Sequence, residues 1–387
     1  MPADVIRKLF ISDGLACCDS TDATHTHLAI PERNMHRENN FDAVRLLAAA
    51  VVIFGHAHPL TSTPDSGLLG NSVQALAVKI FFVISGYLIC TSWTLDPRPI
   101  SYLLKRSLRI FPALLVICIL TIFIIGPALT SLPIGHYFAT PHTYVYLKNV
   151  FLSPVYDLPG LFANNRYPIA VNGSLWSLPI EFAMYLLLPF VCFFDRLMNS
   201  KMVALCASIA LCFFSIHFVR MSVPANHPVI YGTDLISALD VAPYFMIGAL
   251  VRQMSWESLL NPVLALFFIG IVALMPPTTA VHDEIVLYFM LPYVVLTFAL
   301  SSHRLLQGAG RFGDFSYGLY LYGFLVQQCV NDLSGNTLSA LQNAFISLPI
   351  ALVLAYLSWH LIEKPMLSLK PRKNLASKKL TIEEQGA

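Results

Sequence analysis

The chain has 387 residues, of which 56% are hydrophobic and only 12% are charged, and its mean hydropathy is +0.65. A soluble domain carries about a quarter charged residues, so this composition excludes an ordinary soluble protein and indicates an all-α polytopic membrane protein. This composition makes the lipid bilayer an expected partner. The formal net charge of +2 says little about other partners, and we expect no nucleic acid. The eight cysteines show no metal-ligand spacing, so we expect no metal site.

The polar segments lie at the two ends of the chain. Residues 1–38 lack hydrophobic periodicity and are expected to be disordered. Residues 39–366 form the membrane domain, and residues 367–387 form a basic C-terminal tail. Within the membrane domain, hydropathy predicts about ten spanning helices. They are expected near residues 41–58, 72–93, 109–130, 174–194, 202–220, 233–251, 258–275, 284–300, 315–331 and 340–362.

Lysine and arginine residues are unevenly divided between the two sides of this arrangement. If the N-terminus is inside, the outside connections hold only Lys148, Arg166 and Arg220. The inside segments hold Arg33, Arg37, Arg98, Lys105, Arg106, Arg109, Arg196, Lys201, Arg252, Arg304, Arg311, Lys364, Lys370, Arg372, Lys373, Lys378 and Lys379. Because basic residues favour the cytoplasmic side, this distribution predicts an even number of spans with both termini cytoplasmic.

The first predicted span carries two ionisable residues on one face. Arg45 and His56 are eleven residues apart, which is about three helical turns and roughly 16 Å along the axis. Ionisable groups inside an apolar span are costly unless they face a protein interior or a wet cavity. The pair indicates one cavity with a cation at each end. The alternative, given equal weight, is that Arg45 snorkels at one helix end and His56 caps the other.

Further ionisable residues lie in or beside the predicted spans. Arg106 and Arg109 share a helix face and suit bidentate phosphate binding, although residues at this side commonly serve only as topology determinants. Lys79 is a cation in the second span. Glu181 lies about a turn into the fourth span, and Asp314 precedes the ninth.

The connection over residues 131–173 is the longest and is rich in proline and tyrosine. Long connections are often functional. Aromatic residues such as Tyr167 in this connection and Trp176 just after it would stack on sugar faces, or would serve as interfacial anchors, which is the commoner role.

Six short motifs, in order along residues 39–366, resemble the bacterial acyltransferase family 3 of integral membrane O-acyltransferases. The motifs are Arg45 with His56, Phe81–Tyr87 followed by Leu88 and Ile89, Arg106 with Arg109, Trp176–Glu181, Ser316–Leu321, and Glu363–Pro365. One position departs from the family pattern: the ninth-span motif often ends in His, and this chain has Gly323 there.

The resemblance implies transfer of an acyl group, most often acetyl, from acyl-CoA to a hydroxyl of a sugar, glycan or glycolipid in the bacterial inner membrane. His56 is then the expected general base, with Arg45, Glu181 and Asp314 as further catalytic residues. Asp314 is considered as the carboxylate that orients His56.

The resemblance also implies where the two substrates bind. Arg106, Arg109 and Lys79 are assigned to acyl-CoA binding, and Trp176 and Tyr167 to acceptor binding. Acyl-CoA enters as a co-substrate, and no resident cofactor is expected. The alternative function is a transporter or flippase of a lipid-linked sugar, which would more often show inverted repeats or broken helices in matching halves; we find neither in the sequence.

Overall fold

The computed structural model of the protein describes residues 39–65, 67–168, 170–276, 278–301, 311 and 313–371. The expected tail over residues 1–38, and the C-terminal tail from residue 372 onward, lie outside the described residues. The long helices are α1 (Phe41–Leu60), α2 (Val73–Leu95), α3 (Pro99–Leu120), α7 (Ser177–Leu197), α8 (Met202–Ser215), α9 (Leu235–Met254), α10 (Pro262–Leu274), α11 (Ala280–Leu300), α13 (Ser316–Leu333) and α14 (Ala340–Ser358).

Shorter elements extend or connect the long helices. The short helices are η2 (Thr121–Ile125), α4 (Gly126–Leu129), α5 (Ile134–Ala139), α6 (His142–Val145), η3 (Tyr146–Phe151), η4 (Gly173–Trp176), η5 (Ile216–Met221), η6 (Trp256–Leu259), η8 (Trp359–Glu363) and α15 (Lys364–Ser368). Strands β1 (Val229–Ile230) and β2 (Thr233–Asp234) form an antiparallel hairpin.

All ten predicted segments are helical, and eight of the described helical segments are long and apolar enough to cross a membrane. The two others differ for separate reasons. Helix α10 has 13 residues, about 20 Å at 1.5 Å per residue, against a hydrocarbon core of about 30 Å. Helix α13 is long enough, but it carries the buried amides Gln327, Gln328 and Asn331. The prediction of an all-α polytopic membrane protein is confirmed.

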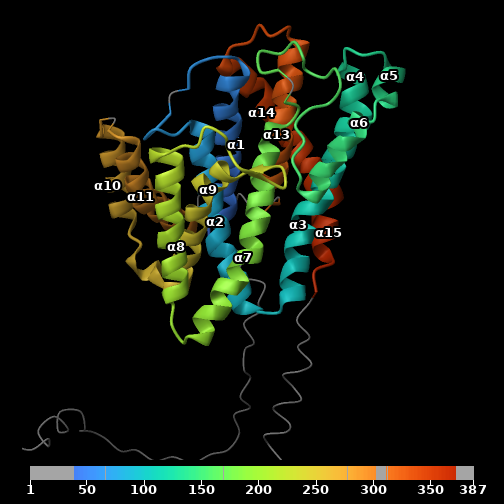
Figure 1. Cartoon of the computed structure of the whole chain (residues 1–387). Helices are drawn as coiled ribbons and strands as arrows, with labels where there is room; N and C mark the ends of the chain where they lie inside the picture. The colour runs from blue at the N-terminus through green and yellow to red at the C-terminus, as the bar shows by residue number, and fades with distance from the viewer. Residues whose placement is uncertain are drawn as a thin grey trace, which may run out of the picture. The chain divides into compact units, whose positions relative to one another are not determined.

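Helix α1 packs between α2, α13 and α14, and α2 packs in turn on α9 (Figure 1). Helices α10 and α11 lie at one edge of the described bundle, and α3 with α15 at another. We call the end where α1 begins, marked by Arg45, Arg106 and Arg109, the basic end. We call the end where α1 finishes, covered by residues 131–172, the loop end.

Side-chain amides of α13 and α14 hold α1 at the loop end. Gln327 donates to the Ile53 carbonyl at 2.8 Å, and Asn331 donates to the Leu60 carbonyl at 2.9 Å. Asn343 of α14 donates to the side-chain oxygen of Asn331 at 2.8 Å. Buried amides are expensive unless they are hydrogen-bonded, so these contacts fix the segment of α1 that contains His56.

Two glycines allow α2 and α9 to approach closely. A Cβ at Gly86 would lie 1.9 Å from the Phe245 carbonyl oxygen, and one at Gly248 would lie 2.2 Å from the Val83 carbonyl oxygen. Both obstacles are backbone atoms, which cannot turn aside as a side chain can. Small residues that let helix backbones meet are a common device in membrane proteins.

We therefore expect Gly86→Ala to destabilise the protein by about 3 kcal/mol, because the added methyl group forces α2 and α9 apart. The measurement is thermal unfolding in detergent. Gly270→Ala is the matched control, since a Cβ at Gly270 in α10 meets no atom within 4 Å. Equal unfolding temperatures for the two variants would contradict this interpretation.

Candidate functional site

A network of ion pairs joins four helical segments at the basic end. Asp314, just before α13, binds Arg45 of α1 and Arg109 of α3, each at 2.6 Å and through the same oxygen Oδ2. Arg109 also binds Glu363 of η8 at 3.1 Å, and Ser358 donates to the other oxygen of Glu363 at 3.0 Å. The two arginines predicted on separate spans therefore share one carboxylate.

This network corrects the expected pairing of Asp314 with His56. Burial alone raises the pKa of Asp314, but Arg109 and Arg45 outweigh burial and hold that pKa well below its usual range. Asp314 is thus an ionised anchor for two arginines. His56 lies about three turns farther along α1 than Arg45, roughly 16 Å away, and no described carboxylate is hydrogen-bonded to it.

A narrow cavity of about 50 Å³ opens beside this network. Its walls include Arg45, Arg109, Glu181, Tyr317 and Tyr320. Such a volume holds one or two water molecules. The cavity runs along the α13 face that carries both tyrosines, one helical turn apart.

Glu181 lies in the wall of this cavity without a described ion pair. Ser85 donates to its Oε1 at 2.8 Å, and Tyr185 donates to the same oxygen. Glu181 is not the ion-pair partner of Arg45, because Arg45 pairs with Asp314. Glu181 therefore faces the cavity with hydrogen bonds from two hydroxyl groups and no described ion pair.

Arg106 differs from Arg109 in having an unused donor. Its Nε is buried and has no hydrogen-bond partner among the described residues. Lys370, after α15, is half-buried near the same group. Burial, together with the positive charges of Arg106, Arg109 and Lys105, lowers the pKa of Lys370 to about 8. Crowded cations of this kind are expected where an anion is to bind.

His56 lies in the loop-end half of α1, beside an aromatic ring. Its imidazole meets the ring of Phe324 edge to face, with centroids 5.2 Å apart. The Nδ1 atom of His56 is buried and has no hydrogen-bond partner among the described residues. A buried polar atom without a partner is uncommon, so a water molecule or a substrate group is the expected partner.

Gly323, at the position where the related motif often has His, packs directly against α1. A Cβ there would lie 2.8 Å from Cγ1 of Ile53. A side chain at this position would displace Ile53, one turn before His56. The close packing of α1 and α13 in this chain is therefore incompatible with a second histidine at that place.

A second cavity, of about 490 Å³, lies at the loop end. Its walls include Tyr156, Tyr167, Trp176 and Asp234. The two aromatic residues assigned to the acceptor thus line one cavity. Burial and the neighbouring Asp234 and Tyr167 raise the pKa of Tyr156 to about 12, so its hydroxyl stays protonated and able to donate a hydrogen bond.

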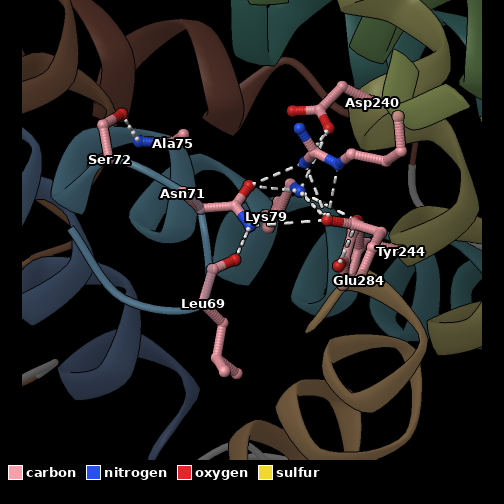
Figure 2. A network of polar contacts seen from close by, with 9 residues as sticks. Leu69, Asn71, Ser72, Ala75, Lys79, Asp240, Tyr244 and Glu284 are labelled. Atoms are coloured by element: carbon pink, nitrogen blue, oxygen red, sulfur yellow. Dashed lines mark hydrogen bonds and ion pairs between the residues drawn. The ribbon is translucent and has the colours of Figure 1, made fainter. Parts of the chain in front are cut away.

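Lys79 belongs to a different network, shown in Figure 2. Its Nζ binds Asn71 at 2.7 Å, Glu284 at 2.9 Å and Asp240 at 3.1 Å. Arg220 binds the same two carboxylates. All three protons of the Lys79 ammonium group therefore have acceptors.

This geometry does not support the assignment of Lys79 to acyl-CoA binding. Lys79 is fully buried, and it lies at the loop end, where α2 begins, away from Arg106 and Arg109. Tyr244 completes the shell by donating to Glu284 at 2.7 Å. A phosphate could bind Lys79 only by breaking these contacts.

The sequence reasoning did not single out Phe324, Tyr317 or Tyr320 as individual site residues. They recur at three- or four-residue spacing along α13, which is the signal of one helix face. Their contacts with His56, Arg109 and the basic-end cavity depend on packing between distant spans.

The chain is similar to known acyltransferases. The family model described as an acyltransferase domain matches residues 38–360. An O-acetyl transferase of Shigella phage Sf6 is 31% identical over 341 residues, covering 86% of this chain and 97% of that protein. Nodulation protein 10 of Rhizobium leguminosarum bv. viciae is 28% identical over 391 residues, covering 91% and 98%.

A third relative is longer than this chain. Peptidoglycan O-acetyltransferase OatA of Listeria monocytogenes serovar 1/2a is 26% identical over 363 residues, covering 84% of this chain but 55% of that protein. No solved structure matches significantly. Because the family model spans most of the chain, the protein belongs to acyltransferase family 3 and is a multi-pass membrane acyltransferase.

Proposed function

We propose that the protein transfers an acyl group, acetyl in the simplest case, from acyl-CoA to a hydroxyl group of a glycan. The observation that carries this proposal is the position of His56. It lies on the helix that runs from the arginine network at the basic end to the aromatic cavity at the loop end, with an unpartnered ring nitrogen. The printed names of two relatives, an O-acetyl transferase and a peptidoglycan O-acetyltransferase, support acetyl as the group and a glycan as the acceptor.

We further propose that the basic end faces the cytoplasm of a bacterial inner membrane. The excess of lysine and arginine at that end supports this orientation. The first and last described segments, near Asn40 and Lys370, both lie at the basic end. Cytoplasmic termini follow from this orientation, and acyl-CoA would reach the arginines from the cytoplasm.

Donor binding in this proposal rests on Arg106 and Lys370 rather than on all the basic residues of the cluster. Arg109 is occupied by Asp314 and Glu363, so it positions the site and adds positive potential. The free Nε of Arg106 supplies a directional donor for a phosphate oxygen. Arg45 and Glu181 line the basic-end cavity, which would have to widen for the acyl thioester to pass toward His56.

Acyl transfer itself requires one base. His56 would take the proton from the acceptor hydroxyl as its oxygen attacks the thioester carbonyl carbon. The carbon–sulfur bond then breaks, and the proton passes to the leaving thiolate. The products are an O-acyl ester and free CoA.

The acceptor would bind in the loop-end cavity. Tyr167 and Trp176 offer ring faces for a sugar, and the Tyr156 hydroxyl and Asp234 carboxylate offer a donor and an acceptor for sugar hydroxyls. These groups gather in one space, which supports a carbohydrate ligand. Neither the comparisons nor the geometry favours the alternative of a lipid-linked sugar transporter.

The central prediction concerns His56. His56→Ala should lower acetyl transfer by about 10²–10⁴-fold, because positioned proton transfer contributes that much. His58→Ala should retain most activity, since His58 lies near Thr63, with Nδ1 3.3 Å from its hydroxyl oxygen. Release of free CoA from acetyl-CoA, at matched membrane levels of each variant, is the measurement. A dead His58→Ala variant with an active His56→Ala variant would refute the assignment.

Arg106→Ala should raise the KM for acetyl-CoA about tenfold or more, because a hydrogen bond to a charged group is lost, and should leave the acceptor KM nearly unchanged. Arg196→Ala is the control, since Arg196 is exposed at the same end on α7. Steady-state kinetics with each substrate varied in turn distinguishes the two effects. A change confined to the acceptor KM would argue against donor binding at Arg106.

The pKa of Lys370 predicts how binding of the acyl donor depends on pH. Its pKa of about 8 means that it is mostly charged at neutral pH and loses its charge above that value. The KM for acetyl-CoA should therefore rise a few-fold from about pH 7 to about pH 9 as one attraction for phosphate disappears. Lys370→Gln should have the higher KM throughout and a flatter profile, while Lys201→Gln, at an exposed position of the same end, should behave as wild type. Identical pH profiles for wild type and Lys370→Gln would exclude this role.

A further inference from the structure

The ring of Phe324 lies between His56 and the loop-end cavity. Its centroid is 5.2 Å from that of His56 and 6.2 Å from that of Tyr167, and both pairs meet edge to face. Tyr167 is a wall residue of the cavity, whereas His56 lies on α1. Phe324 therefore contacts both the expected base and a wall residue of the expected acceptor cavity.

The other side of the same ring is closed by backbone. A Cβ at Gly173 would lie 2.7 Å from Cε2 and 2.8 Å from Cζ of Phe324, and Gly173 also lines the cavity. The ring is buried, with 5% of its surface exposed. A glycine is required at position 173 for the ring to seat this closely.

We propose that Phe324 is a gate that separates His56 from the loop-end cavity until an acceptor is bound. This inference rests on the proposed function. In the observed position the ring blocks the approach of a hydroxyl group from the cavity to His56. A sugar seated against Tyr167 and Trp176 would displace the ring by rotation about its side-chain bonds and bring a hydroxyl to the imidazole.

The gate would also exclude water, which is the competing nucleophile. Water that reached His56 would give its proton to the imidazole and attack the thioester carbonyl carbon. The carbon–sulfur bond would break, the proton would pass to the thiolate, and the products would be a carboxylic acid and free CoA. Closing a site against this wasteful hydrolysis is an established use of a mobile element.

The matched control for the gate is Phe345 on α14. It also makes an edge-to-face aromatic pair, with Phe54 at 5.2 Å, but it is 63% exposed and has no described ring contact with His56. Phe345→Ala removes an aromatic ring of the same size without opening the cavity toward the base.

The experiment measures free thiol released from acetyl-CoA by the purified full-length protein without any acceptor. Phe324→Ala should raise this hydrolysis by roughly tenfold over wild type and over Phe345→Ala, because water gains access to the base. Phe324→Leu, which keeps an apolar side chain, should give a smaller increase. The double variant Phe324→Ala with His56→Ala should lose the gain, and thermal unfolding would verify that each variant is folded.

A gain in hydrolysis is a readout that general damage to the fold would not produce. Wild-type rates for both Phe324→Ala and Phe324→Leu, with hydrolysis still dependent on His56, would overturn the gate and leave the proposed function standing. Absence of thioester consumption by wild type when a glycan acceptor is present, or an unchanged rate of that consumption in His56→Ala, would overturn the proposed function and the gate together.

Discussion

One carboxylate oxygen of Asp314 binds two guanidinium groups from two different helices, and the basic end depends on that contact. Arg45 and Arg109 would repel each other without it. The two ion pairs are part-buried, and loss of Asp314 would release α1 and α3 from α13 together. The ionised state of Asp314, held by the same arginines, is thus part of the fold as well as of the candidate site.

Helix α13 serves two purposes that its composition explains. Its basic-end half presents Tyr317 and Tyr320 to the cavity, and its loop-end half presents amides that bind the backbone of α1. The amides lower its hydropathy below that of an ordinary span. The same residues that make α13 a poor lipid-facing helix make it a suitable internal one, since its polar groups are satisfied by neighbouring helices.

The local sequence pattern was sufficient to predict the helices and the shared face of Arg45 and His56, because both depend on residue spacing along one segment. It was insufficient to predict which charged residues pair with each other. Lys79 and Asp314 have partners more than 200 residues away in the chain, and no local periodicity encodes such contacts. The placement of Phe324 beside His56 likewise depends on how α1 and α13 pack, through Gly323 and Ile53. Trp176 and Tyr167 do line one cavity, although their binding role stays a proposal.

The network around Lys79 also constrains how this sequence can change during evolution. Lys79 and Glu284 are both fully buried. Loss of the lysine alone would leave Asp240 and Glu284 facing the single cation Arg220, and loss of the glutamate alone would leave two cations facing one carboxylate. Replacing both members of a buried ion pair together destabilises a protein far less than replacing only one member. The two positions are 205 residues apart in the chain. We therefore expect that during evolution both residues are kept, or that both are substituted together.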